Sequence, residues 1–184
     1  MKKPLIILFV VVLFVGGYVW STYNKLVTTN EAIDNQWAQV ESQYQRRFDL
    51  IPNLVASVKG IMAQEQKIFG DLAEARTKYS GAVTVDEKAA AATQVEGALG
   101  RLLVVMENYP QLKSAENVQT LMVQLEGTEN RIAVERQRYN DSVKTFNVIV
   151  KRIPAKWLAS QFGFTERNYF EAVQGSETAP KVEL

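Results

Sequence analysis

The sequence contains neither cysteine nor histidine. Without cysteine the chain can form no disulfide, thiolate nucleophile or thiolate metal site, and it cannot carry a lipid on a lipobox cysteine. Without histidine it lacks the usual acid–base catalyst at neutral pH and the commonest ligand of zinc, iron and copper. A ferritin-like di-iron centre is excluded because it requires Glu-x-x-His pairs. We therefore expect no metal and no cofactor.

An excess of charge of one sign is missing as well. Lys and Arg number 21 and Asp and Glu number 20, so no broad basic field is available to attract nucleic acid, and we expect no nucleic-acid partner. The sequence has no glycine-flanked serine elbow, no Ser-x-x-Lys motif and no phosphate-binding glycine loop. A Ser or Thr nucleophile with a Lys base, or a carboxylate pair, stays formally open. The sequence predicts a protein that is not an enzyme, with no catalytic or cofactor-binding residues.

What the sequence does have is a long apolar run near its N-terminus. Residues 4–20 carry no charge, which is about the shortest run that crosses ~30 Å of hydrocarbon as a helix, and an extension to residue 23 is comfortable. A cleaved signal peptide is the rival interpretation. Bulky aromatic residues stand where small cleavage-site residues would be needed, and they resemble an interfacial belt. These residues are Tyr18, Trp20 and Tyr23. A retained transmembrane anchor is favoured.

The charges on either side of this run predict its orientation. Lys2 and Lys3 precede it, whereas Lys25 on the other side is soon offset by Glu31 and Asp34. The positive-inside rule then places the N-terminus in the cytoplasm of a bacterial cell. We expect a single-pass protein of the inner membrane whose remaining residues face the periplasm or the exterior.

Helical periodicity continues beyond the membrane segment. Apolar residues recur with the alternating three-and-four spacing of a heptad seam at Tyr23, Leu26, Ile33, Trp37, Val40, Tyr44 and Ile51. Pro52 is expected to end or kink this helix and to suit the first turn of the next one, which runs to about Tyr79. Thr84 and Glu87 form a capping box for a third helix that stops near Pro110.

The fourth helix is expected to be the longest. Ser114 is a suitable N-cap, and Pro154 marks the end of the helix. Its seam residues are Val118, Leu121, Leu125, Ile132, Tyr139, Phe146, Val150 and Ile153. Short links between long helices favour antiparallel neighbours.

The predicted fold is all-α, with an N-terminal transmembrane helix that continues into an up-down-up-down, coiled-coil-like four-helix bundle. The expected parts are a short N-terminal tail (1–3), the anchor (4–23), the bundle (24–174) and a polar tail (175–184).

Polar residues interrupt the apolar seams. They are Asn30, Arg47, Glu65, Arg76, Glu129 and Arg136. We expect them to form a structural polar layer, because buried ions must be paired and such a layer tolerates only one helix register. The alternative, a carboxylate metal site or catalytic carboxylates, would need acidic side chains to outnumber basic ones, which they do not.

An aromatic-rich segment follows the fourth helix. Since that helix must return toward the membrane, Trp157, Phe162 and Phe164 are candidates for an interfacial foot that touches the bilayer surface. The alternative is that these rings pack against the bundle, as most Phe and Tyr clusters do.

Three segments resemble the LemA family of bacterial membrane proteins. The first comprises residues 45–55 with 58–60 and Glu65; the second, residues 102–103 and 107–113; the third, residues 125–133 with Arg136, Tyr139, Asn140 and Asn147. The resemblance implies an N-terminal anchor and a helical bundle, and it implies no particular enzymatic activity. Some family members are described with the N-terminus outside, opposite to the orientation that the lysines indicate.

Two functions follow from these features. The first is a membrane-rooted bundle that associates with copies of itself as an envelope scaffold or membrane-organising assembly. Gly16 and Gly17 would allow helices to approach closely in the bilayer. The second is an adaptor or regulator of another membrane protein, such as a quality-control protease. The expected partners are thus the lipid bilayer and either a homo-oligomer or a second membrane protein.

Overall fold

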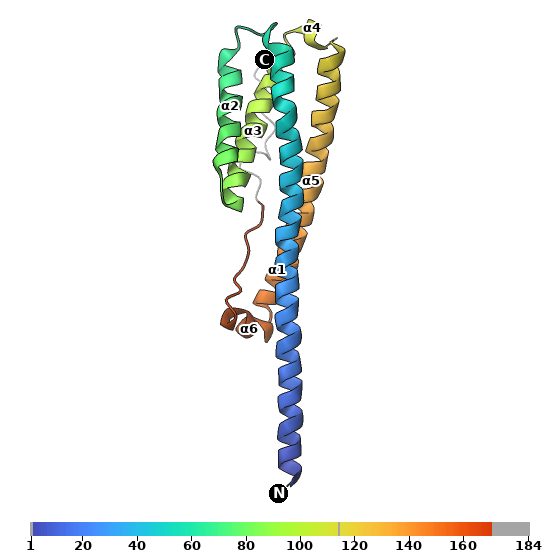
Figure 1. The fold of residues 1–184 in the computed structure, drawn as a ribbon, viewed down its shortest axis with the longest axis vertical. Helices are drawn as coiled ribbons and strands as arrows, with labels where there is room; N and C mark the ends of the chain where they lie inside the picture. The colour runs from blue at the N-terminus through green and yellow to red at the C-terminus, as the bar shows by residue number, and fades with distance from the viewer. Residues whose placement is uncertain (1, 114, 171–184) are drawn as a thin grey trace, which may run out of the picture. The chain divides into compact units, whose positions relative to one another are not determined.

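The computed structural model describes residues 2–113 and 115–170, and these ranges contain helices and turns but no strand. The helices are α1 (Lys2–Lys59), α2 (Gln66–Gly81), α3 (Val85–Met106), α4 (Pro110–Lys113), α5 (Glu116–Lys151) and α6 (Ala155–Gln161) (Figure 1). The prediction of an all-α fold with a long apolar N-terminal helix is confirmed. Ser114, proposed as an N-cap, and the tail 175–184 lie outside the described residues.

Helix α1 runs without a break from the apolar stretch into the folded part of the chain. The predicted seam is buried at Leu26, Ile33, Trp37, Val40, Tyr44 and Ile51. Tyr23 is the exception, since 40% of it is exposed. The three-and-four spacing therefore predicted correctly which face of α1 packs against the other helices.

Pro52 does not end α1, and the expectation that the helix stops or a new one starts there was wrong. Proline removes one amide donor and costs a helix interior about 3 kcal/mol. Ile51, Leu54 and Val58 are at most 3% exposed on the same face of α1. Since burial of one such side chain contributes about 1.5–3 kcal/mol, packing outweighs the proline defect and the helix continues to Lys59. The second helix consequently starts at Gln66, after a turn that buries Met62.

The described residues divide into two compact units. The first comprises residues 2–40 and 135–169, and the second comprises residues 41–113 and 115–134 with Phe170. Both α1 and α5 contribute a part of their length to each unit.

The second unit is a four-helix bundle made of the end of α1, α2, α3 and the start of α5, with α2 and α3 side by side (Figure 1). Its core contains an aromatic cluster in which the Phe48 ring lies 4.4 Å from that of Tyr79 and 5.8 Å from that of Tyr44. The capping box predicted at the start of α3 is confirmed: the Glu87 N–H donates to Thr84 Oγ1 at 3.2 Å, and the Thr84 N–H donates to Glu87 Oε2 at 3.0 Å.

The first unit pairs the N-terminal part of α1 with the C-terminal part of α5, and α6 follows. Trp37 and Tyr139 meet edge to face with ring centroids 5.5 Å apart. Helix α5 ends at Lys151, three residues before Pro154, so the prediction that Pro154 marks the end of this helix is confirmed. The prediction that Ile153 belongs to its apolar seam was wrong, because Ile153 follows the helix and is 64% exposed.

Candidate functional site

A buried arginine is the centre of a polar cluster in the second unit. Arg47 lies on α1 and is only 7% exposed. Its Nη1 forms ion pairs with Glu129 of α5 and, at 3.5 Å, with Oε1 of Glu96 of α3. Helical periodicity turns the side chain of Arg47 inward along with Tyr44 and Ile51, so the guanidinium needs carboxylates from the facing helices.

The structure brings together two of the six predicted polar residues, Arg47 and Glu129. Glu96 was missed, because it stands beside the Val95 seam position and a sequence pattern does not say which flanking charge turns toward a buried partner. Glu65 and Arg76 lie on other parts of this unit: Glu65 is the N-cap residue of α2 and accepts a hydrogen bond from the Tyr109 hydroxyl at 3.4 Å. Arg76 lies half-buried within α2.

The other two predicted polar residues belong to the first unit. Arg136 is half-buried on α5. Asn30 accepts a hydrogen bond through Oδ1 from Arg167 Nη1 at 3.3 Å, and Arg167 also pairs with Asp34. A register role for the predicted polar layer stays a prediction.

Arg167 is also fixed through its backbone. Its N–H donates to Asn147 Oδ1 at 2.9 Å, and Asn147 Nδ2 donates to the Arg167 carbonyl at 2.8 Å. Asn147 is 3% exposed, so this reciprocal pair ties the segment after α6 to α5 inside the unit. Asn147 occurs in the family-like third segment, but its partner twenty residues away gave no signal in the sequence.

The aromatic residues near the end of the apolar run meet the segment after α6. Gly163 has a φ of +76°, and its N–H and that of Phe164 donate back to the carbonyls of Ser160 and Ala159. This is a Schellman motif, which needs glycine at the left-handed position and turns the chain back. As a result, Phe162 lies 4.9 Å and Phe164 6.2 Å from the Tyr23 ring.

The three residues predicted as an interfacial foot differ in their packing. Phe164 is half-buried between Tyr23 and Phe146. Trp157 is 66% exposed and Phe162 is 44% exposed. Phe164 therefore fits the alternative that these rings pack against helices, whereas the Trp157 ring is exposed on the surface.

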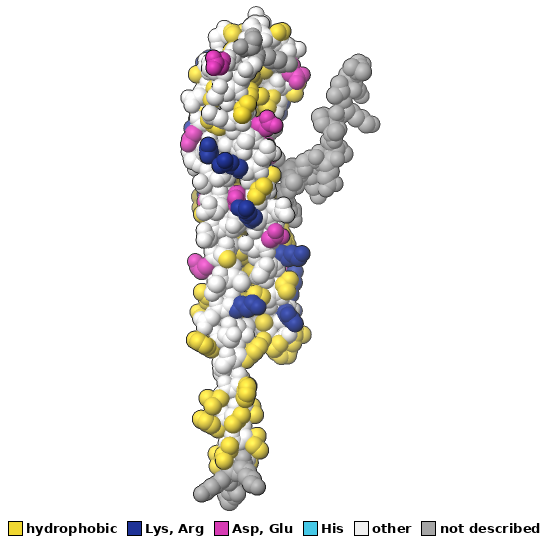
Figure 2. Space-filling view, turned by 90° about the vertical axis from the view of Figure 1, so that its right-hand side faces the viewer, with side chains coloured by type: hydrophobic (Ala, Val, Ile, Leu, Met, Phe, Trp, Pro, Cys, Tyr) yellow, Lys and Arg dark blue, Asp and Glu magenta, His cyan; other side chains and the backbone are white. Residues whose placement is uncertain are grey.

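The start of α1 carries an uncovered apolar surface. Every residue from Leu5 to Val15 is exposed, and Figure 2 shows hydrophobic side chains around this stretch. By length and composition this part of α1 could cross a membrane. Helix α3 passes the same test, but it supplies core residues to the second unit. Tyr18 and Trp20 are also exposed, and the side chains of Lys2 and Lys3 lie outside the described part of the structure.

Among the described residues, three ionisable groups have shifted pKa values. Burial, assisted by the negative charge of Glu41, raises the pKa of the Tyr79 phenol. Hydrogen bonds from the backbone and side chain of the capping box lower the pKa of Glu87. The hydrogen bond and charge of Glu166 raise the pKa of Lys151. Each shift has a structural cause, and within residues 2–113 and 115–170 no group of three acidic side chains is arranged to hold a metal ion.

The sequence model of the LemA family matches residues 36–184, which include the Arg47 cluster, the Asn147–Arg167 pair and the segment after α6. The chain belongs to the LemA family. The match covers most of this LemA-family protein and begins after the apolar run. It confirms the resemblance carried by the three sequence segments.

The LemA-family chain is also similar to three magnetosome proteins. Magnetosome proteins MamQ 1 and MamQ 2 of Paramagnetospirillum magneticum are each 28% identical to it, and magnetosome protein MamQ of Magnetospirillum gryphiswaldense is 29% identical. Each alignment covers 85% of this chain and 67% of the relative.

Proposed function

We propose that this LemA-family protein is a non-enzymatic, single-pass membrane protein whose helical units form a scaffold with other copies. The observation that carries the proposal is the exposed apolar stretch from Leu5 to Val15 at the start of α1. An apolar surface of this kind needs a cover, and the uncharged run from residue 4 to residue 23 that contains it is long enough to cross the hydrocarbon core of a bilayer. Helix α1 is continuous from this stretch to Lys59, so the anchor is joined to the folded part of the chain without an intervening loop.

The anchor also offers a surface for self-association. A Cβ placed on Gly16 or Gly17 would meet no atom within 4 Å, so nothing in the described chain packs against these glycines. Small residues let membrane helices approach closely, which supports pairing of anchors from two copies. The two N-terminal lysines favour an inner-membrane protein with a cytoplasmic N-terminus and the bundle on the other side.

The test has two parts, both with the full-length protein. Membranes that contain it are first washed at alkaline pH, and the proposal expects the protein to stay in the membrane fraction. The mass of the wild-type protein in mild detergent is then compared with that of the double variant Gly16→Val with Gly17→Val. The wild type should form a defined assembly, and the double variant should be dissociated. The matched control, Val10→Ile with Val11→Ile, adds bulk elsewhere on the anchor and should leave the assembly intact.

Three results would count against the proposal. Release of the protein by the alkaline wash would contradict the proposed membrane anchor. A wild-type protein that is monomeric in detergent would contradict the scaffold role and favour the adaptor role, and cross-linking to another membrane protein would then be the next experiment. Equal dissociation of the glycine variant and its control would show that Gly16 and Gly17 are not the contact.

A further inference from the structure

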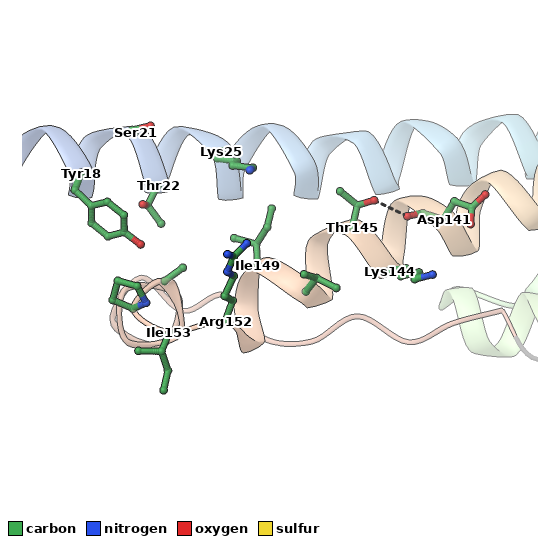
Figure 3. A pocket seen from close by; sticks show the side chains of 13 residues that line it. Tyr18, Ser21, Thr22, Lys25, Asp141, Lys144, Thr145, Ile149, Arg152 and Ile153 are labelled. Carbon is green, nitrogen blue, oxygen red and sulfur yellow. Dashed lines mark hydrogen bonds between the residues drawn. The ribbon is translucent and has the colours of Figure 1, made fainter.

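A basic cleft lies beside the end of the apolar stretch, within the first unit. Its volume is about 880 Å³, and it is bounded by residues 18–25 of α1, the last turns of α5 and the chain around Pro154 (Figure 3). This volume is in the range of small-ligand sites. We propose that the cleft binds the phosphate-bearing headgroup of an anionic phospholipid.

The charges that line the cleft support an anionic ligand. Lys25, Lys144 and Arg152 contribute three cations and Asp141 one carboxylate, which leaves two positive charges in excess. Among the described residues, none of these three cations is paired with a carboxylate. Lys151, outside the cleft, is by contrast paired with Glu166 at 2.8 Å. Unpaired cations that share one cleft are free to neutralise a phosphate.

Hydroxyl groups complete the polar wall. Tyr18 and Thr22 extend from the side of α1 that faces Arg152 (Figure 3). Thr22 lines the cleft and is only 8% exposed. Hydroxyl donors beside a guanidinium suit phosphate oxygens, which are strong acceptors.

The position of the cleft selects a lipid over a soluble anion, and this step rests on the proposed membrane anchor. At 1.5 Å per residue, a helix from residue 4 to residue 23 spans about 30 Å, which is the thickness of the hydrocarbon core. Residues 18–25 then straddle the boundary where headgroups lie. Ile153 lines the cleft and is 64% exposed, and Trp157, four residues later in the chain, is 66% exposed. Exposed apolar side chains next to cations match a ligand with an anionic head and an apolar tail.

The test measures lipid binding to the full-length protein in mild detergent by native mass spectrometry. Phosphatidylglycerol and phosphatidylcholine with the same acyl chains are titrated separately. The cleft variant is the double substitution Lys144→Gln with Arg152→Gln. The control is the double substitution Lys151→Gln with Lys156→Gln, which removes the same charge from the same unit at positions outside the cleft. Asp141→Asn provides the opposite change.

The wild type should prefer phosphatidylglycerol. Each basic side chain near a bilayer surface changes affinity for anionic lipid about fivefold, so the cleft variant should bind it about thirtyfold more weakly. Asp141→Asn should bind it about fivefold more tightly, and the control should stay near the wild type. Equal affinity for the two lipids, or equal loss in the cleft variant and the control, would overturn the proposal. Complete displacement of the lipid by glycerol 3-phosphate would also overturn it, because the site would then take a soluble phosphate.

An alkaline wash of the same membranes separates the two proposals. A protein that is retained but shows no lipid preference would refute only the headgroup site. A protein that is released into the wash would refute the anchor itself.

Discussion

Removal of both carboxylates beside Arg47 is the sharpest perturbation of the bundle. In the variant Glu96→Gln with Glu129→Gln, the guanidinium stays 7% exposed and loses both ion-pair partners. At 3.5 Å and an effective dielectric constant of about 20, one such pair corresponds to about 5 kcal/mol before the cost of desolvation. The side chains of Glu96 and Glu129 are 24% and 44% exposed, so solvent reduces the net value to about 1 kcal/mol each.

Loss of both partners costs more than that sum because it leaves a buried charge without compensation. The expected destabilisation is about 3–5 kcal/mol, which lowers the melting temperature by about 10 °C for a protein of this size. Arg47→Met in the same background should recover most of the loss, since no buried charge then remains.

The assay is thermal unfolding of the full-length protein in mild detergent, followed by far-UV circular dichroism. Glu107→Gln with Glu126→Gln is the matched control, because it removes two exposed carboxylates of the same unit. The reasoning is refuted if the cluster variant melts no lower than this control, or if Arg47→Met destabilises the cluster variant further.

Three further variants test the second unit. Tyr79→Phe removes a buried hydroxyl that has no hydrogen-bond partner among the described residues, so stability at neutral pH should stay the same or rise by about 1 kcal/mol. The Tyr79 phenol keeps its proton in the folded protein above the pH at which an unfolded tyrosine loses it, so wild-type stability should fall as pH rises past about 10. The stability of Tyr79→Phe should fall less over the same range. An equal loss of stability in the two proteins at alkaline pH would contradict this. Thr84→Ala should cost about 1 kcal/mol in thermal melts by removing the α3 cap. Because the pKa of Glu87 is lowered in the folded protein, its contribution to stability is complete above the ordinary glutamate pKa and is lost as pH falls through the lowered value. Glu87→Gln should therefore lose less stability than the wild type as the pH is lowered. An equal loss of stability in the two proteins would argue against this.

The buried faces of α1 and α5 could largely be predicted from the sequence, whereas the exposure of Ile153 and the continuation of α1 through Pro52 could not. Seam positions such as Leu26, Ile33 and Ile132 are fully buried, because period 3.6 follows from backbone geometry alone. The boundary prediction at Pro52 was wrong because the free-energy cost of the proline is smaller than the free energy gained by burying its neighbours on α1. That burial depends on the tertiary structure and not on the local sequence.

The candidate sites were less predictable than the helices. Arg47 and Glu129 could be recognised as polar interruptions of apolar seams, and the structure pairs them. Glu96 and Arg167 could not be recognised, because the partner of each lies far away in the chain. Glu96 stands beside the apolar seam of α3, and Arg167 lies outside the helices. The association of Tyr23 with Phe164 depends on a left-handed glycine whose effect appears only when the chain folds back.

The sequence by itself determined the helical class, the apolar run long enough to cross a bilayer and the lack of thiol and imidazole chemistry. These properties depend on composition and on periodicity along one helix, which residues carry wherever the helix packs. Only the tertiary structure decided which carboxylates surround Arg47, how the segment after α6 returns to α1 and α5, and that Lys25, Lys144 and Arg152 line one cleft. Those arrangements depend on the rotation and register of packed helices, which are set by the fit of side chains from distant parts of the chain.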